Sequence, residues 1–462
     1  MKRTSILVLL ALMSLFTIQF GVLAQDSSVP EVLTMPEQIA EGRPVTIVVT
    51  DKPATDAPEA LANWEAQVAR FNELYPNVTV EGLEFAYDPA AFTALIAGDQ
   101  VPTLFRTYFT EPQKLIDEGV AADISPYFEA AGVAGVFNPE LLGIAERDGA
   151  LYGIPQDAYA LGLAYNIPML EAAGYDAPPA TWDELVEMAV ALTDRDAGVA
   201  GFAFINDGSG AAGWHFTNIA YSFGATPADI IALGEDGAAT ATFGEGATVE
   251  AMQFVHDLRW EHDVLPGATL DWGSISEALI SGRVAMAIYA GDQFDFVYNQ
   301  FPDADLSQFG YAAVPGTGET RATLTGGNLW MISASASADE QEAAAFYQLW
   351  RQFDTTEMSL GIEVSTEAFG RPLLPLYVGD YQEAWAAFRE PYNVLPVENY
   401  EAFNSAVIGG EVQLQSEPVV ATQDYYAEVG VVVSEILSSE SVDPAARLAE
   451  AADEFQAFVL DR

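Results

Sequence analysis

The residues of this sequence best suited to bind a ligand are large aromatic side chains in turn-rich segments. Trp214 lies in the Gly/Ala-rich stretch GAAGWHF (210–216), where no helix or strand pattern accounts for so large a side chain. A flat ring suits an apolar ligand face such as that of a pyranose, whose hydroxyl groups pair with carboxylates, amides and Arg. The alternative is that Trp214 fills the core, because Trp is generally well buried.

Two further candidates lie near the carboxyl end of an expected strand at residues 284–290. Tyr289 and Asp292 occur in AIYAGDQF (287–294). Open α/β sheets bind ligands outside the carboxyl ends of their strands, so both side chains are candidates for a cleft rim. A core tyrosine and a solvated turn aspartate are the alternatives.

A pair of glycines precedes the next candidate. Gly326 and Gly327 allow the backbone to approach a ligand closely, and Asn328 follows them with an amide. Trp330 would share the face of Asn328 in an alternating strand. The remaining candidates are Tyr108 beyond the turn at Pro102, Trp272 in LDWGS (270–274) and Arg371 in FGRPLLP (369–375).

The sequence does not point to a metal ion, a cofactor or a catalytic centre. His256 and His262 are six residues apart, whereas a helical zinc pair needs a spacing of four. The segment TDRDAG (193–198) lacks the later ligands and the terminal Glu of a calcium loop. Cysteine is absent, which excludes disulfides, thiolate metal sites and a cysteine nucleophile.

Length and charge bound the class of protein. A chain of 462 residues exceeds the size at which a single core usually divides, so we expect two lobes. The 68 Asp and Glu outnumber the 17 Lys and Arg and give a net charge of −51. This charge disfavours nucleic acid and anionic membranes as partners, because both are bound through basic clusters.

The N-terminus has the layout of a secretory signal. Lys2 and Arg3 precede an apolar run over residues 6–23, and the small residue Ala24 ends it. We expect cleavage after Ala24 (signal 1–24), a short linker at 25–43, and a protein in the periplasm or outside the cell. Without cysteine it would not be lipid-anchored; an uncleaved membrane anchor is the alternative.

Hydrophobic periodicity predicts alternating strands and helices. Residues 44–50 and 78–85 have strand patterns, and apolar residues at helical spacing lie between them, which favours a mainly parallel α/β sheet. Further helices are expected around 251–258, 275–279, 346–353, 429–436 and 448–455, and a strand at 284–290.

The stretch 161–185 contains a strand, a short helix and a second helix start in close succession. Residues 161–165 are an apolar strand, residues 167–173 a two-turn helix that Gly174 ends, and the double proline at 178–179 prevents its continuation. Thr181 and Glu184 have the spacing of a capping box.

This stretch, together with ALYGIPQDAYA (150–160), resembles the central signature of bacterial extracellular solute-binding proteins of the maltose-binding type, which feed ABC importers. The matching motifs are YGIP (152–155), Tyr165-Asn166, Ala173-Gly174, Pro179 and TWDEL (181–185). Residues 91–108, 277–294 and 309–333 resemble further family segments, so the resemblance covers roughly residues 44–400. Thr103 stands where the family commonly has Asp.

The resemblance implies an α/β, two-lobe periplasmic-binding-protein fold (type II) with a ligand cleft between the lobes. Three hinge crossovers are expected near residues 159–161, 312–315 and 354–357. The first lobe would then comprise 44–158 plus 316–354, and the second 162–310 plus 357–462. In relatives the loop before the hinge strand presents ligand contacts, which adds Asp157 and Tyr159 to the candidates.

The function that the resemblance implies is non-catalytic capture of a carbohydrate and its delivery, by a monomer, to ABC transporter permease subunits. A secreted glycoside hydrolase is one alternative, since paired carboxylates suffice for that chemistry. No carboxylate pair, however, stands in an apolar strand-end motif that would raise one pKa. A binding protein for a peptide or a cation is the other alternative, and the acidic composition suits cations.

Overall fold

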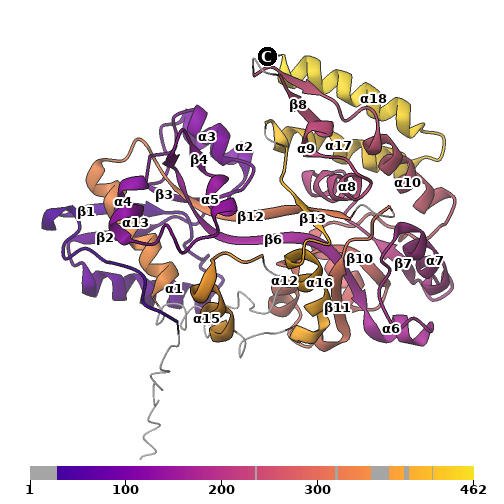
Figure 1. The fold of residues 1–462 in the computed structure, drawn as a ribbon, viewed down its shortest axis with the longest axis horizontal. Helices are drawn as coiled ribbons and strands as arrows, with labels where there is room; N and C mark the ends of the chain where they lie inside the picture. Colours follow the sequence, from indigo (N-terminus) through magenta and orange to yellow (C-terminus); the bar gives the residue numbers. More distant parts are fainter. Residues whose placement is uncertain are drawn as a thin grey trace, which may run out of the picture.

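Two long strands join two α/β lobes that lie side by side in a computed structural model (Figure 1). The structure describes residues 29–234, 237–317, 321–354, 374–389, 395–418 and 420–461. The expected signal at 1–24 and the candidate Arg371 lie outside these residues. The mixed α/β architecture with a cleft between two lobes is the fold expected from the sequence.

One sheet of nine strands runs through both lobes. In the first lobe β2 (Val78–Gly82), β1 (Val45–Val49) and β3 (Leu104–Tyr108) are parallel, and β12 (Ala322–Ile332) lies antiparallel to β3. In the second lobe β6 (Gly153–Asn166) pairs antiparallel with β10 (Val284–Ala290) and β11 (Phe309–Ala313), and β7 (Ala200–Ala203) is parallel to β10. Strand β13 (Gln413–Gln415) is parallel to the start of β12.

The sheet is mixed, which corrects the expectation of a mainly parallel one. Strand β6 leads the chain into the second lobe and β12 leads it back, so the two strands run antiparallel. Strands β1, β2 and β3 are parallel because the connecting helices return the chain to the end of the sheet at which each strand begins.

Helices cover the sheet in both lobes (Figure 1). Those of the first lobe are α1 (Pro58–Leu74), α2 (Pro89–Ala97), α3 (Pro112–Asp117), α4 (Ser125–Ala131), α5 (Pro139–Gly143), α13 (Ala338–Phe353) and α15 (Gly379–Arg389). Those of the second are α6 (Ile167–Ala172), α7 (Trp182–Leu192), α8 (Gly210–Ser222), α9 (Pro227–Ile230), α10 (Ala247–Trp260), α11 (Trp272–Ile280), α12 (Gln293–Gln300), α16 (Glu401–Ile408), α17 (Thr422–Ser438) and α18 (Pro444–Phe455). Short hairpins are β4 (Glu146–Arg147) with β5 (Ala150–Leu151) and β8 (Ile231–Leu233) with β9 (Ala239–Ala241).

The expected capping box at the start of α7 is present. The Glu184 amide donates to Thr181 Oγ1 at 3.2 Å, and the Thr181 amide donates to the Glu184 carboxylate at 3.2 Å. Directly before it, α6 is held by Asn166, whose side chain accepts from the Met169 amide at 3.0 Å. These caps fix two short helices immediately after the strand that enters the second lobe.

The chain changes lobe at three places. Strand β6 pairs with β12 up to Ala160, with β10 from Leu161 and with β11 from Gly162 on. Strand β12 pairs with β13 over residues 322–324 and with β3 only from Asn328, so this crossing lies near 325–327 and not at 312–315.

The last crossing also differs from the expected boundary at 354–357. Residues 374–389 pack on the first lobe, since the Leu374 amide donates to Ala158 O at 2.8 Å and the Asn138 amide to Leu376 O at 2.9 Å. Asn399, in contrast, donates to Phe309 O of the second lobe at 2.9 Å. The chain therefore enters the second lobe for the last time after Arg389.

The expected linker is part of the first lobe over its described residues. Val29, Ile39 and Ala40 are buried in the core, and Tyr75 donates to Pro36 O at 2.6 Å. Residues 29–43 therefore pack as a strap on this lobe. Composition alone suggests a linker because most residues of this segment are polar. Its few apolar side chains nevertheless reach the core of the first lobe.

Candidate functional site

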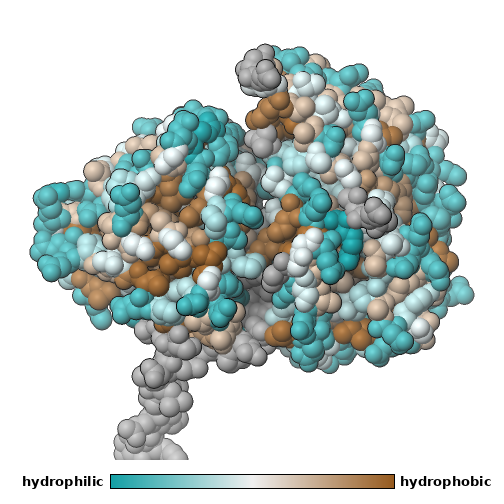
Figure 2. All heavy atoms as spheres, viewed as in Figure 1, coloured by the Kyte–Doolittle hydropathy of each residue, from teal (hydrophilic) through white to brown (hydrophobic). Residues whose placement is uncertain are grey.

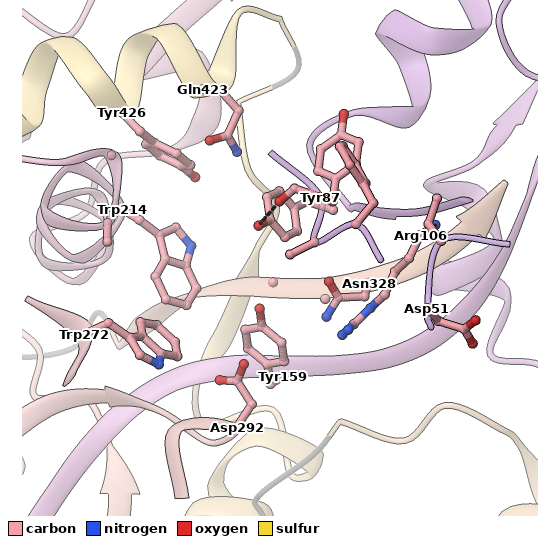
Figure 3. A pocket seen from close by; sticks show the side chains of 18 of the residues that line it. Asp51, Tyr87, Arg106, Tyr159, Trp214, Trp272, Asp292, Asn328, Gln423 and Tyr426 are labelled. Carbon is pink, nitrogen blue, oxygen red and sulfur yellow. Dashed lines mark hydrogen bonds between the residues drawn. The ribbon is translucent and has the colours of Figure 1, made fainter. Parts of the chain in front are cut away.

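A pocket of about 960 Å³ opens between the two lobes, near the upper end of the usual range of roughly 300–1,000 Å³ for small-molecule sites. The molecular surface is indented between the lobes (Figure 2). Strand ends of the first lobe and helix starts of the second form its walls, and the crossing strands form its floor (Figure 3). The lining residues with charged or large side chains are Asp51, Lys52, Glu84, Phe85, Tyr87, Arg106, Tyr108, Tyr159, Trp214, Trp272, Asp292, Asn328, Glu417, Gln423 and Tyr426.

Three aromatic rings stand together at the second-lobe end. Trp214, Trp272 and Tyr159 are all only partly buried, and the rings of Trp214 and Tyr159 meet edge to face with centroids 6.1 Å apart. The carboxylate of Asp292 points toward Tyr159 (Figure 3). Burial, and next the charge of Asp292, raise the pKa of the Tyr159 hydroxyl. A ligand ring with polar substituents can stack here and bond the carboxylate.

Trp214 lies on helix α8 and not in a loop, which corrects the sequence-based interpretation. The glycines that suggest a loop serve helix packing instead. A Cβ at Gly213 would lie 2.0 Å from Tyr426 O, and one at Gly430 would lie 2.1 Å from Ser209 O. Helices α8 and α17 therefore cross with their backbones in close contact, and this contact points Trp214 toward the pocket.

The Gly326-Gly327 pair in β12 makes room for rings as well as for a ligand. A Cβ at Gly326 would lie 2.9 Å from the Tyr159 ring and 3.2 Å from Trp214, and one at Gly327 would lie 2.4 Å from the Phe109 ring. Both glycines line the pocket. At these two positions the floor of the pocket therefore consists of backbone atoms alone.

A hydrogen-bonded group of three polar side chains forms the floor beside these glycines. Asn328 Nδ2 donates to Asp157 Oδ1 at 2.9 Å, and the Arg106 guanidinium lies 3.5 Å from Asp157 Oδ2. Asp157 is 5% exposed and belongs to β6, not to a loop. It does not line the pocket wall but orients Asn328 and Arg106, which do.

The first-lobe wall consists of residues at the carboxyl ends of β1, β2 and β3. Tyr108 donates to Tyr87 O at 2.9 Å, and their rings meet at 5.2 Å. Asp51 is paired with half-buried Arg351 and accepts from Trp64 Nε1 at 2.9 Å, which fixes its carboxylate at the rim. Of this wall, only Tyr108 was a candidate from the sequence, although the strand-end rule applies equally to Asp51 and Lys52, which follow β1.

Glu417, Gln423 and Tyr426 complete the second-lobe wall, and the sequence analysis did not find them. Burial, together with the smaller effect of the charge of Glu111, raises the pKa of Glu417 to about 8. Tyr426 donates to Glu417 Oε1 at 3.1 Å, which acts in the opposite direction. No local pattern marks these residues. Glu417 follows β13, which pairs with the start of β12, whereas Gln423 and Tyr426 lie on α17, which packs against α8.

Of the candidates from the sequence, six line the pocket: Trp214, Tyr159, Asp292, Asn328, Trp272 and Tyr108. Tyr289 is fully buried, with its hydroxyl 2.7 Å from Ser276 Oγ, so it belongs to the core. Trp330 is 1% exposed and packs under the guanidinium of Arg351, 4.9 Å from its ring. Strand β12 pairs with β3 without a register shift from Asn328 to Ile332, so Trp330 shares the face of Asn328 as expected, but Arg351 covers it.

Among the described residues, no group of three or more His, Asp or Glu side chains is arranged to hold a metal ion. Within the same part of the chain, no helix is both long and apolar enough to cross a membrane. The pocket offers rings, hydroxyls, amides and charges to a ligand.

Comparison with known proteins gives consistent results. The family model for bacterial extracellular solute-binding proteins matches residues 54–350. A putative binding protein of Brucella abortus is 28% identical over 203 residues, which is 43% of this chain and 46% of that protein. The chain thus matches just under half the length of such curated relatives.

Solved structures with a similar fold include maltose-bound MalE3 of T. maritima, with a TM-score of 0.70 and 21% identity over 90% of this chain and 100% of that one. The GacH receptor of Streptomyces glaucescens, solved unliganded and with acarbose, has a TM-score of 0.69 and 20% identity over 90% and 99%. UgpB of Mycobacterium tuberculosis, in complex with glycerophosphocholine, has a TM-score of 0.64 and 18% identity over 90% and 98%.

The fold and the pocket define a two-lobe α/β binding protein with a pocket in the interlobe cleft. The chain belongs to the bacterial extracellular solute-binding protein family, whose model matches well over half of it.

Proposed function

We propose that this protein captures a carbohydrate outside the cytoplasmic membrane and delivers it to the permease of an ABC transporter. The observation that carries the proposal is the composition of the pocket, with Trp214, Trp272 and Tyr159 at one end and Arg106 and Asn328 at the other. Aromatic faces stack on sugar rings, and the amide and guanidinium bond hydroxyl oxygens. The similar structures solved with maltose and acarbose support the same ligand class.

Binding proceeds by closure of the two lobes over the ligand. The crossing strands β6 and β12 and the last crossing after Arg389 are the segments about which the lobes rotate. A ligand that contacts both walls favours the closed form, because it gains contacts that the open form lacks. The protein acts as a monomer without chemical change to its ligand, and the closed form is the one that docks on the permease.

A thermal-shift screen against a carbohydrate library tests this function, because a ligand that binds only the folded protein raises the melting temperature. The library contains maltose, cellobiose, trehalose, their longer oligomers, mannitol and ribitol. We expect at least one saturable increase, with the carbohydrate recovered unchanged by chromatography. Release of shorter sugars or of a chromogenic aglycone would instead establish a glycoside hydrolase, and an increase only with peptides or cations would exclude carbohydrate capture.

A further inference from the structure

A chain of three hydrogen bonds links the two lobes beside the pocket. Gln423 Nε2 of the second lobe donates to Thr110 Oγ1 of the first lobe at 3.0 Å. Thr110 Oγ1 donates to Glu111 Oε1 at 3.2 Å, and the Tyr87 hydroxyl donates to Glu111 Oε2 at 3.1 Å. Gln423 and Tyr87 both line the pocket, whereas Glu111 is buried, with 4% of its surface exposed. The chain of bonds thus joins two pocket walls that belong to different lobes.

The directions of these bonds are mutually consistent. A carboxylate only accepts hydrogen bonds, so Glu111 takes the single hydroxyl proton of Thr110. The Thr110 oxygen is then left as an acceptor, which is what the amide nitrogen of Gln423 requires. The charged carboxylate also polarises the Thr110 hydroxyl and strengthens the bond that its oxygen accepts. Burial and the charge of Glu111 raise the pKa of Tyr87, so the Tyr87 hydroxyl keeps its proton and remains a donor.

Each partner of the interlobe bond is fixed to its own lobe. Thr110 lies in the tight turn after β3, where the Glu111 amide donates to Tyr108 O at 3.2 Å. Gln423 lies in the first turn of α17, whose backbone is in close contact with Gly213 of α8. Rotation of one lobe against the other therefore changes the distance between the two side chains. A hydrogen bond is lost once its heavy atoms are more than about 3.5 Å apart, so the bond exists only while the lobes stay close to the arrangement of this structure.

We propose that Gln423 and Thr110 form an interlobe clasp that holds the lobes together before a ligand binds, and that Glu111 positions this clasp. The inference rests on the lobe closure proposed above and adds that part of the closure precedes the ligand. A hydrogen bond of ordinary strength changes an equilibrium by roughly fivefold. The clasp therefore raises the ratio of closed to open protein and still allows the lobes to open.

The clasp also affects the affinity for a ligand. A ligand that binds only the closed form has an apparent dissociation constant inversely proportional to the closed fraction of the empty protein. Glu111 holds Tyr87 at the pocket wall through the same carboxylate that orients Thr110. Closing the clasp thus brings Gln423 against a wall whose side chains are already in place, and the ligand has less to order.

Single-molecule energy transfer between two dyes resolves the closed and open populations without any ligand. The chain has no cysteine, so dyes can be attached to cysteines introduced at exposed alanines, Ala130→Cys in α4 and Ala228→Cys in α9. Thr110→Val keeps the shape of the side chain and removes the hydroxyl. We expect it to lower the ratio of closed to open protein by roughly fivefold, with a longer mean interdye distance. Thr110→Ser keeps the hydroxyl and should restore the ratio of the unsubstituted chain.

A second threonine provides the matched control. The Thr93 hydroxyl donates to Pro89 O at 2.8 Å within α2, so Thr93→Val removes a hydroxyl without touching the contact between the lobes. Glu111→Gln should give a ratio between those of the unsubstituted chain and Thr110→Val, because a neutral amide polarises the Thr110 hydroxyl less than a carboxylate does. Near-ultraviolet circular dichroism checks that each variant is folded. If Thr110→Val is not, Gln423→Leu carries the test and should lower the ratio to the same extent.

An unchanged ratio in Thr110→Val, or an equal fall in Thr93→Val, would overturn the clasp. A Glu111→Gln variant with the ratio of the unsubstituted chain would overturn the positioning role of Glu111. The measurement also separates this inference from the proposed function, because it needs no sugar. A lower ratio in Thr110→Val with no carbohydrate active in the screen removes only the proposed function. Equal ratios in the two chains, together with closure of both by maltose, cellobiose or trehalose, remove only this inference.

Discussion

The ring of Trp214 meets the ring of Tyr159 edge to face, with centroids 6.1 Å apart and planes at 85°. One ring belongs to a helix of the second lobe and the other to the strand that joins the lobes. Gly326 in β12 lies against both, so close that a Cβ there would be 2.9 Å from Tyr159 and 3.2 Å from Trp214. Because Gly326 has no side chain, the rings of Tyr159 and Trp214 can both lie against its backbone.

Gly326→Ala should therefore lower affinity for the best carbohydrate of the screen by about tenfold or more, equivalent to about 1.4 kcal/mol. The added methyl displaces two rings that we propose to contact the ligand. Titration calorimetry measures the change. Gly135→Ala is the matched control, because a Cβ there meets nothing within 4 Å. Equal affinities for the two variants would show that the ring pair does not bind the ligand.

Trp214→Ala should weaken binding by about 2 kcal/mol, the scale of a central contact residue. Trp214→Phe should remove most of the ligand-induced change in tryptophan fluorescence. Trp260→Phe is the control, because Trp260 donates to Ile436 O in the second lobe and does not line the pocket. A fluorescence change that survives in Trp214→Phe and disappears in Trp260→Phe would place the ligand elsewhere.

Asp157→Asn should destabilise the fold by about 2 kcal/mol, because it removes a buried charge that accepts from Asn328 and faces Arg106. Denaturant unfolding monitored by circular dichroism measures this free energy. The exposed Asp196→Asn is the control and should stay within about 0.5 kcal/mol of the unsubstituted chain. Equal stability of the two variants would contradict the positioning role of Asp157.

His215 should make the fold sensitive to acid. It is fully buried beside Trp214, its Nδ1 accepts from the Ile205 amide at 3.3 Å, and burial lowers its pKa to about 3. The unfolded chain therefore binds a proton below the ordinary pKa of 6.5 that the folded chain does not. The stability contributed is present above pH 6.5 and is lost as the pH falls toward 3.

His215→Asn keeps an acceptor for Ile205 and removes the titrating ring, so its free energy of unfolding should fall less between pH 6.5 and 4 than that of the unsubstituted chain. Urea unfolding at several pH values measures both slopes. Replacing the partly exposed His262 by Asn is the control for the loss of a histidine as such. The prediction would be wrong if the free energy of unfolding changed equally with pH in the His215→Asn variant and in the unsubstituted chain.

Local patterns in the sequence predict much of the fold. The alternation at 44–50, the helical spacing from Leu61 to Phe71 and the Thr181–Glu184 box each depend on neighbours in the chain, and β1, α1 and the start of α7 form where expected. Tertiary packing overrides the pattern at α8, where glycines that favour a loop allow two helices to touch.

The site is predictable where its residues follow strands. Asp292 could be proposed from this rule, and Asp51 and Lys52 meet the same condition. Glu417 and Tyr426 lie some 250 residues or more beyond Tyr159 in the chain. The pairing of β13 with β12 brings Glu417 to the pocket, and the packing of α17 on α8 brings Tyr426 there. Tyr289 and Trp330 are buried in contact with Ser276 and Arg351, respectively. No pattern in the neighbouring sequence predicts either contact.

A structure of the protein saturated with the best carbohydrate of the screen shows directly whether the interlobe pocket holds the ligand. We expect the sugar to lie in this pocket, stacked on Trp214 or Trp272 of one lobe and hydrogen-bonded to Arg106 or Asn328 at the other end. A sugar bound outside this pocket, or held by one lobe alone with the other wall untouched, would contradict it.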